Sequence, residues 1–174
     1  GPNKKQQPAY GTDLLRAWVA SSSYTADISI GPDILKVTFE QLRRIRNSGR
    51  FLLGNLHNFE LARDGVAIDE MAGLDRFVLH AVSNTVAEAA SAYDSHAFPK
   101  AYAAITTLVN QYLNGFFFEV AKDRLYLEEP SSLARRSAQT AMHFSFDALT
   151  RTIAPVAVHL AEEFHSFRRG VNPS

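Results

Sequence analysis

The 174-residue chain contains no cysteine, only one tryptophan and no excess charge of either sign. Without cysteine it can form neither a disulfide framework nor a metal site built on thiolates. No apolar run approaches the roughly 20 residues that a membrane-spanning helix needs, so we expect no membrane partner. Its 18 Lys and Arg residues are balanced by 18 Asp and Glu residues. Any nucleic-acid site must therefore come from local clustering of cations.

Catalytic motifs are also missing. The chain has no Gly-x-Ser-x-Gly nucleophile motif and no phosphate-binding loop. Glu162-x-x-His165 is half of a di-iron pattern, but the second Glu-x-x-His pair that a carboxylate-bridged bundle requires does not occur. We therefore expect no catalytic residue, no metal ligand and no cofactor in this chain, and interpret Glu162 and His165 as a solvated helix end.

The apolar residues recur at helical spacing along most of the chain. This periodicity predicts an all-α fold, an antiparallel helical bundle of about five main helices joined by short connections. A short helix from Thr12 or Asp13 and a strand or extended segment at 26–30 should precede the bundle. The main helices are expected at about 32–56, 74–93, from Pro99 past Val120, from Ser131 or Ser132 to about Ile153, and from Pro155 to about Phe164.

The first long helix has a clear start and two distinct faces. Pro32 suits the first helical position, and Asp33 is favoured in the first turn by the helix dipole. One apolar stripe is expected to be buried; it contains Leu35, Phe39, Leu42, Gly49, Leu52, Leu53 and Leu56. At about 100° per residue, four cations fall within roughly 80° of one another beside that stripe. They are Lys36, Arg43, Arg46 and Arg50, which we call the basic strip.

The basic strip has two interpretations. Guanidinium groups spaced along a rigid helix suit the phosphate backbone of RNA or DNA. Alternatively, the strip is a solvated face with local ion pairs, such as Lys36 with Glu40.

A second group of cations brackets the acidic pair Glu128-Glu129. Its members either pair with those carboxylates and with Asp123, or face RNA; they are Lys122, Arg124, Arg135 and Arg136. Nearby, Phe116-Phe117-Phe118 could offer one ring for stacking on an unpaired base, although a core role is favoured for such aromatics.

Several of these segments, taken in order, resemble the anticodon-binding region of isoleucyl-tRNA synthetases of the bacterial and mitochondrial type. The resemblance runs from Tyr10 to about Phe164. Phe77 stands where the family has Trp, and the segment ending at His165 lacks the family's usual Trp. The similar segments are 10–21, Gly-Pro-Asp-Ile-Leu-Lys at 31–36, Arg-Arg-Ile-Arg-Asn at 43–47, 50–56, Leu-Asp-Arg-Phe-Val-Leu-His at 74–80, Lys-Asp-Arg-Leu-Tyr at 122–126 and 135–140.

The resemblance implies an RNA-binding module of an isoleucine–tRNA ligase. The parent enzyme would attach isoleucine to its tRNA with ATP and magnesium, but the HIGH, KMSKS and editing segments are not in this chain, which should be inactive alone. Expected partners are the anticodon stem-loop and the parent's catalytic domain; we expect a monomer. The expected location is the mitochondrial matrix, or the cytoplasm if the source is bacterial. The alternative is a structural or protein-interaction bundle.

The implied organisation has four parts. Residues 1–9 would be a mobile lead-in whose Gly1-Pro2 resembles a tag scar, and 10–30 a connector to the catalytic domain. Residues 31–169 would form the anticodon-binding bundle and 170–174 a tail. The basic strip and the second group of cations are the predicted RNA contacts.

Overall fold

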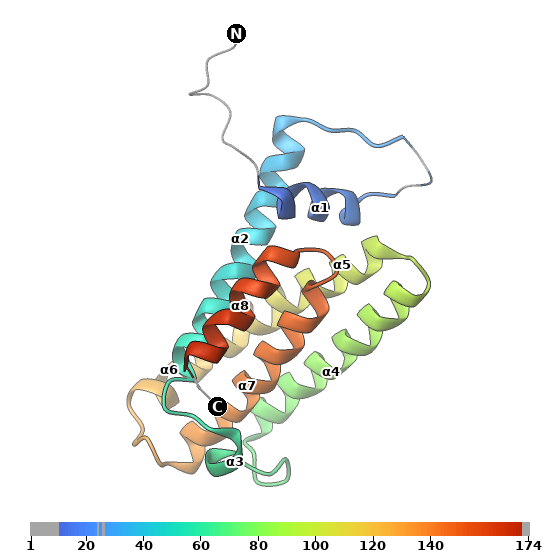
Figure 1. The fold of residues 1–174 in the computed structure, drawn as a ribbon. Coiled ribbons are helices and arrows are strands. Elements are labelled where there is room, and N and C mark those ends of the chain that lie inside the picture. Colours follow the sequence, from blue (N-terminus) through green and yellow to red (C-terminus); the bar gives the residue numbers. More distant parts are fainter. Residues whose placement is uncertain (1–10, 24, 26, 172–174) are drawn as a thin grey trace.

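The computed structural model describes residues 11–23, 25 and 27–171, and these form a helical bundle (Figure 1). Five long helical stretches dominate it, as the sequence predicts, and no described residue is in a strand. The elements are α1 (Thr12–Ser21), α2 (Pro32–Asn55), α3 (Leu61–Asp64), α4 (Gly73–Asp94), α5 (Phe98–Thr107), η1 (Leu108–Phe117), α6 (Phe118–Tyr126), α7 (Leu133–Ile153) and α8 (Val158–Val171).

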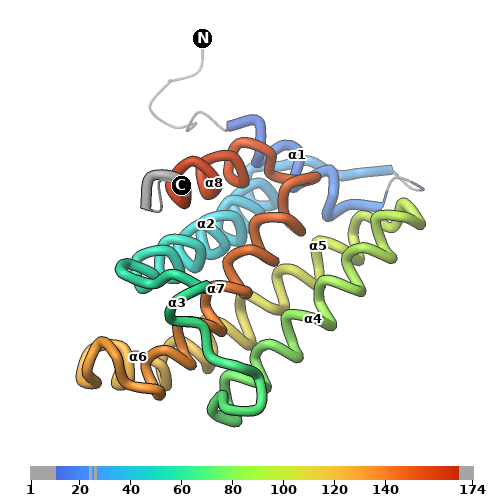
Figure 2. Tube along the Cα trace, turned by 60° about the horizontal axis from the view of Figure 1, so that its bottom comes forward, coloured from blue at the N-terminus to red at the C-terminus, as the bar shows by residue number. Residues whose placement is uncertain are grey.

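The long helices alternate in direction. α2 packs on α7 and η1, while α4 packs on α7, α5 and η1, so that four helical rods surround one core. α8 lies outside this group against α2 and α7, and α1 crosses one end of the bundle against α2, α5 and α8 (Figure 2). This arrangement leaves α2 between the core on one side and solvent on the other.

Helix α7 supplies much of the core. Ser132 caps it by accepting a hydrogen bond from the Arg135 backbone N–H at 3.2 Å, which confirms the predicted cap. Met142, Phe146, Leu149 and Ile153 are all fully buried. Their spacing of four, three and four residues places them on one helix face, as the periodicity predicts.

Some local predictions are wrong. Of the two alternatives for 26–30, the strand is wrong and the extended segment stays open, because residues 27–30 have no regular secondary structure; residue 26 lies outside the described part. Ile28 and Ile30 are exposed, and among residues 11–23, 25 and 27–171 no neighbouring strand offers the backbone hydrogen bonds that a strand needs. The last helix begins at Val158 rather than Pro155, because residues 154–156 form a turn, and α8 continues to Val171, past the expected start of the tail. The expected lead-in, 1–9, lies outside the described residues.

The apolar stripe of α2 is also narrower than predicted. Leu35, Gly49, Leu52 and Leu56 are buried and Leu42 and Leu53 are partly buried, but 48% of Phe39 is exposed. The buried face of α2 is centred instead on Ile45, which is 1% exposed.

η1 is a π-helix, which the helical periodicity of the sequence does not predict. A Cβ atom on Gly115 would lie 2.8 Å from the Asn110 carbonyl oxygen, so the glycine permits this close approach. Phe117 and Phe118 are buried whereas Phe116 is exposed, as expected for a run of three aromatics in which one ring faces out. Among the described helices, none is both long and apolar enough to cross a membrane.

Candidate nucleic-acid interface

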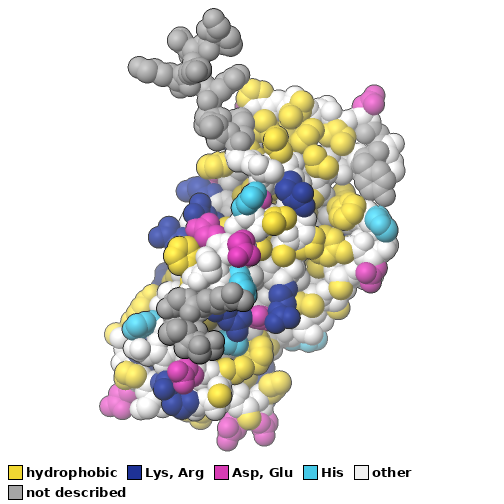
Figure 3. Space-filling view, in the orientation of Figure 1, with side chains coloured by type: hydrophobic (Ala, Val, Ile, Leu, Met, Phe, Trp, Pro, Cys, Tyr) yellow, Lys and Arg dark blue, Asp and Glu magenta, His cyan; other side chains and the backbone are white. Residues whose placement is uncertain are grey.

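The basic strip lies on the solvent side of α2. Lys36, Arg43, Arg46 and Arg50 are all exposed. The space-filling view shows Lys and Arg side chains along the α2 edge of the bundle, with acidic side chains among them (Figure 3). The helix thus presents these cations in one row. The part of the row from Arg43 to Arg50 covers about two helical turns.

Two carboxylates accompany the strip. Glu40 pairs with Arg43 at 2.5 Å between Oε2 and Nη2, and not with Lys36, the example given for the solvated-face interpretation. Glu163 of α8 pairs with Arg46 at 2.5 Å between Oε1 and Nη2. Both arginine side chains are more than half exposed, so each pair contributes only about 0–1 kcal/mol to stability. The arginines can therefore exchange these partners for a ligand at little energetic cost.

Arg124 of the second group has a different environment. Its guanidinium donates two hydrogen bonds to the buried Asp75 carboxylate, from Nη1 at 2.7 Å and from Nη2 at 2.8 Å. Ser137 also donates to Asp75, so this carboxylate joins α4, α6 and α7. With 17% of its side chain exposed, Arg124 holds the bundle together.

Arg136 is similarly enclosed, with 16% of its side chain exposed. It pairs with Asp64 at 3.3 Å and donates to the Asn58 carbonyl at 3.2 Å, which fixes the loop around α3 against α7. A hydrogen bond from Arg63, aided by Arg136, lowers the pKa of Asp64 to about 2. This stabilisation is therefore present above the ordinary pKa of 3.8 and is lost as the pH falls through about 2.

The other two members of the second group lie near the surface. Lys122 pairs with Glu119 at 2.6 Å, and Arg135 donates to the Glu128 backbone carbonyl at 3.3 Å. Within the described residues, none of the four cations pairs with the carboxylates of Glu128 and Glu129. The structure thus brings the basic strip together on one surface but distributes the second group among separate contacts.

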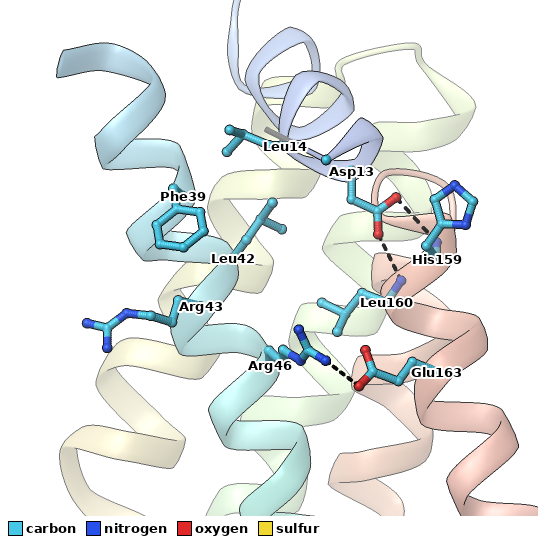
Figure 4. A pocket seen from close by; sticks show the side chains of 10 residues that line it. Asp13, Leu14, Phe39, Leu42, Arg43, Arg46, His159, Leu160 and Glu163 are labelled. Carbon is cyan, nitrogen blue, oxygen red and sulfur yellow. Dashed lines mark hydrogen bonds and ion pairs between the residues drawn. The ribbon is translucent and has the colours of Figure 1, made fainter. Parts of the chain in front are cut away.

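Sequence reasoning missed a hollow beside the strip. It lies between α1, α2 and α8, and Arg43 and Arg46 line it together with residues from the other two helices (Figure 4). Asp13, which with Thr12 was one of two candidates for the start of α1, accepts hydrogen bonds from the backbone N–H groups of His159 and Leu160 at the start of α8. Because these residues are about 145 positions apart, helical periodicity could not pair them.

No three His, Cys, Asp or Glu side chains of residues 11–23, 25 and 27–171 form a group that could hold a metal ion.

Arg44, which the strip does not include, lies on the other side of α2. Its Nη1 donates a hydrogen bond to Oδ1 of Asn110 in η1 at 3.4 Å.

Comparison with known proteins agrees with this architecture. The family model described as "Anticodon-binding domain of tRNA ligase" matches residues 75–173. Isoleucine–tRNA ligases of Crocosphaera subtropica and Gloeobacter violaceus are 41% and 44% identical over 167 and 163 residues, which are 96% and 94% of this chain. The chain spans only 17% of the length of either relative. The chain therefore belongs to the family of tRNA-ligase anticodon-binding domains, and its resemblance to that region of the isoleucine–tRNA ligases is confirmed.

Proposed function

We propose that this chain binds the anticodon stem-loop of an isoleucine tRNA, as part of a longer isoleucine–tRNA ligase. The observation that supports the proposal most directly is the exposed basic strip on α2, in a chain whose family is defined by anticodon binding. Cations in a row along one helix can follow a phosphate backbone, whereas bases in an unpaired loop are read by side chains around them.

The strip contributes to binding through charge. Each phosphate neutralised by Lys or Arg releases condensed counterions, so affinity falls as salt rises. Lys36, Arg43 and Arg50 are our proposed phosphate contacts, and Arg46, which lines the hollow and is bonded there to Glu163, is the proposed contact to a base. Lys122 and Arg135 are secondary candidates, while Arg124 and Arg136 are assigned to holding the bundle.

The activity of the longer protein is proposed by extension. It would join isoleucine to tRNA with ATP and magnesium at a catalytic domain outside this chain, and it would act as a monomer. We propose the mitochondrial matrix as its location, or the cytoplasm if the source is bacterial.

Replacing Arg43 and Arg46 together with alanine should weaken binding of the isoleucine tRNA anticodon stem-loop several-fold. The salt slope should also become shallower by about one unit, because Arg43 is the proposed phosphate contact of the pair and each lost phosphate contact removes about one unit. The melting temperature should stay close to that of the parent, since both arginines are exposed. Binding isotherms at several salt concentrations and a thermal melt measure these effects.

Arg76→Ala with Arg151→Ala is the matched control. Both arginines are exposed on α4 and α7, so this variant loses the same charge away from α2. The Arg76/Arg151 variant should bind RNA more tightly than the Arg43/Arg46 variant, which we call the α2 variant. If the two variants bind equally well, RNA does not lie on the basic strip; if the α2 variant unfolds early, Arg43 and Arg46 are structural. Absence of RNA binding by the parent itself would favour the protein-interaction bundle.

A further inference from the structure

The hollow beside the basic strip has the size and lining of a ligand site. Its volume is about 320 Å³, at the lower end of the range typical for small-molecule pockets. It opens next to Arg43 and Arg46, so a chain that follows the strip would pass its mouth (Figure 4). The residues that matter for its chemistry are Leu14, Phe39, Leu42, Arg46, Leu160 and Glu163.

The inner part of the hollow is apolar. Leu14 and Leu160 are buried and Leu42 is partly buried, so leucines that belong largely to the core form this part of the hollow. Phe39 stands at the side with 48% of its surface exposed. An exposed aromatic ring beside an apolar floor is a suitable surface for a flat π-system, because nucleobases stack on aromatic side chains.

The rim is polar in a specific way. Arg46 Nη2 donates to Glu163 Oε1 at 2.5 Å, which places a donor and an acceptor side by side at the opening. Within the described residues, Nη2 is the only side-chain nitrogen of Arg46 that makes a hydrogen bond. A phosphate at this point would be repelled by the Glu163 carboxylate. The edge of a base, which presents both N–H donors and acceptor atoms, is complementary to both side chains.

The walls of the hollow are held in place by contacts to α1. Asp13 accepts the backbone N–H of Leu160 at 2.8 Å, and Arg16 donates to the carbonyls of Pro155 and Val156 at 2.7 and 2.9 Å. These contacts fix the start of α8, and hence the position of Glu163 one turn further along. The hollow therefore exists before any ligand arrives, which lowers the ordering cost of binding.

We propose that this hollow receives one unpaired base of the bound RNA, stacked on Phe39 with its edge hydrogen-bonded to Arg46 and Glu163. The inference rests on the proposed function and adds to it a base site and two residues that determine which base is accepted. Stacking and hydrogen bonds to an uncharged base neutralise no phosphate, so this site should strengthen binding without steepening its salt dependence.

Phe39→Ala tests the stacking surface. The variant should bind the isoleucine tRNA anticodon stem-loop roughly fivefold to a hundredfold more weakly, the usual loss when a stacking aromatic is removed, with an unchanged salt slope. Phe39→Tyr should restore binding. Val37→Ala is the control, because Val37 is 59% exposed on the same helix but does not line the hollow. Equal affinities for the alanine variants at 37 and 39 would overturn the proposal.

Glu163→Gln tests the polar rim, because weaker and tighter RNA binding by this variant have opposite meanings. If Glu163 accepts hydrogen bonds from a base, the variant should bind RNA several-fold more weakly, even though a negative charge has been removed. Glu162→Gln, one residue away and exposed, removes the same charge outside the hollow and should bind as well as the parent or better. Tighter binding by Glu163→Gln would mean that Glu163 only competes with phosphate for Arg46, and would overturn the base site.

Failure of the base site and failure of the proposed function give different results. If the Arg43/Arg46 variant binds weakly while Phe39→Ala and Glu163→Gln bind like the parent, the strip binds RNA and the hollow does not. If none of these variants differs from the parent, RNA lies on another face and both proposals fail.

Discussion

Replacing Asp75 with alanine should lower the free energy of unfolding by on the order of 3–5 kcal/mol, the usual cost of breaking a buried ion pair. Asp75 is fully buried and accepts two hydrogen bonds from Arg124 and one from Ser137. The substitution leaves the largely buried Arg124 guanidinium without its counterion, and its donors without acceptors. Urea or guanidinium melts of parent and variant measure the difference.

Asp69→Ala is the matched control for this prediction. Asp69 is an exposed carboxylate in the loop before α4, and its loss should change stability by no more than about 0.5 kcal/mol. Arg124→Ala should also be strongly destabilising, because it leaves the Asp75 carboxylate buried and unpaired. If Asp75→Ala lowers the free energy of unfolding by less than about 1 kcal/mol, Arg124 does not depend on Asp75 and becomes a candidate for binding RNA.

Phe146→Ala should cost a similar amount, about 3–5 kcal/mol, for a different reason. Phe146 is 1% exposed and its ring centroid lies 5.6 Å from that of Phe164 in α8. Truncation removes apolar contacts and leaves a cavity between α7 and α8 that the surrounding helices fill only in part. The free energy of unfolding from denaturant melts gives the cost directly.

Phe144 provides the comparison for Phe146. It lies two residues earlier on α7, but 43% of it is exposed, so Phe144→Ala should destabilise the chain far less. Similar losses for the two variants would contradict the packing of α7 described above.

Local chemistry made much of the fold predictable. Pro32 and Ser132 marked where α2 and α7 start, and the spacing of Met142, Phe146 and Leu149 identified the buried face of α7. These features depend on residues within a few turns of one another, which is the range over which helical periodicity applies. The basic strip was predictable for the same reason, since its geometry follows from one helix alone.

Contacts between distant segments were beyond such reasoning. Arg124 resembles the cations of the strip in sequence, yet its partner Asp75 lies 49 residues away and only the packing of α4 on α6 and α7 brings them together. The base-sized hollow likewise depends on α1, α2 and α8, with Glu163 117 residues from Arg46. The π-helix η1 could not be predicted from a 3.6-residue period because its hydrogen bonds span five residues.

The most direct test of RNA binding is a salt titration of the unmodified 174-residue chain with the isoleucine tRNA anticodon stem-loop. We expect saturable binding at low salt, with the logarithm of the association constant falling linearly against the logarithm of salt concentration. The slope should have a magnitude of roughly 2–3, corresponding to the three proposed phosphate contacts of the basic strip, Lys36, Arg43 and Arg50. No saturable binding at low salt, or an affinity that does not change with salt, would contradict the proposal that α2 grips an RNA backbone.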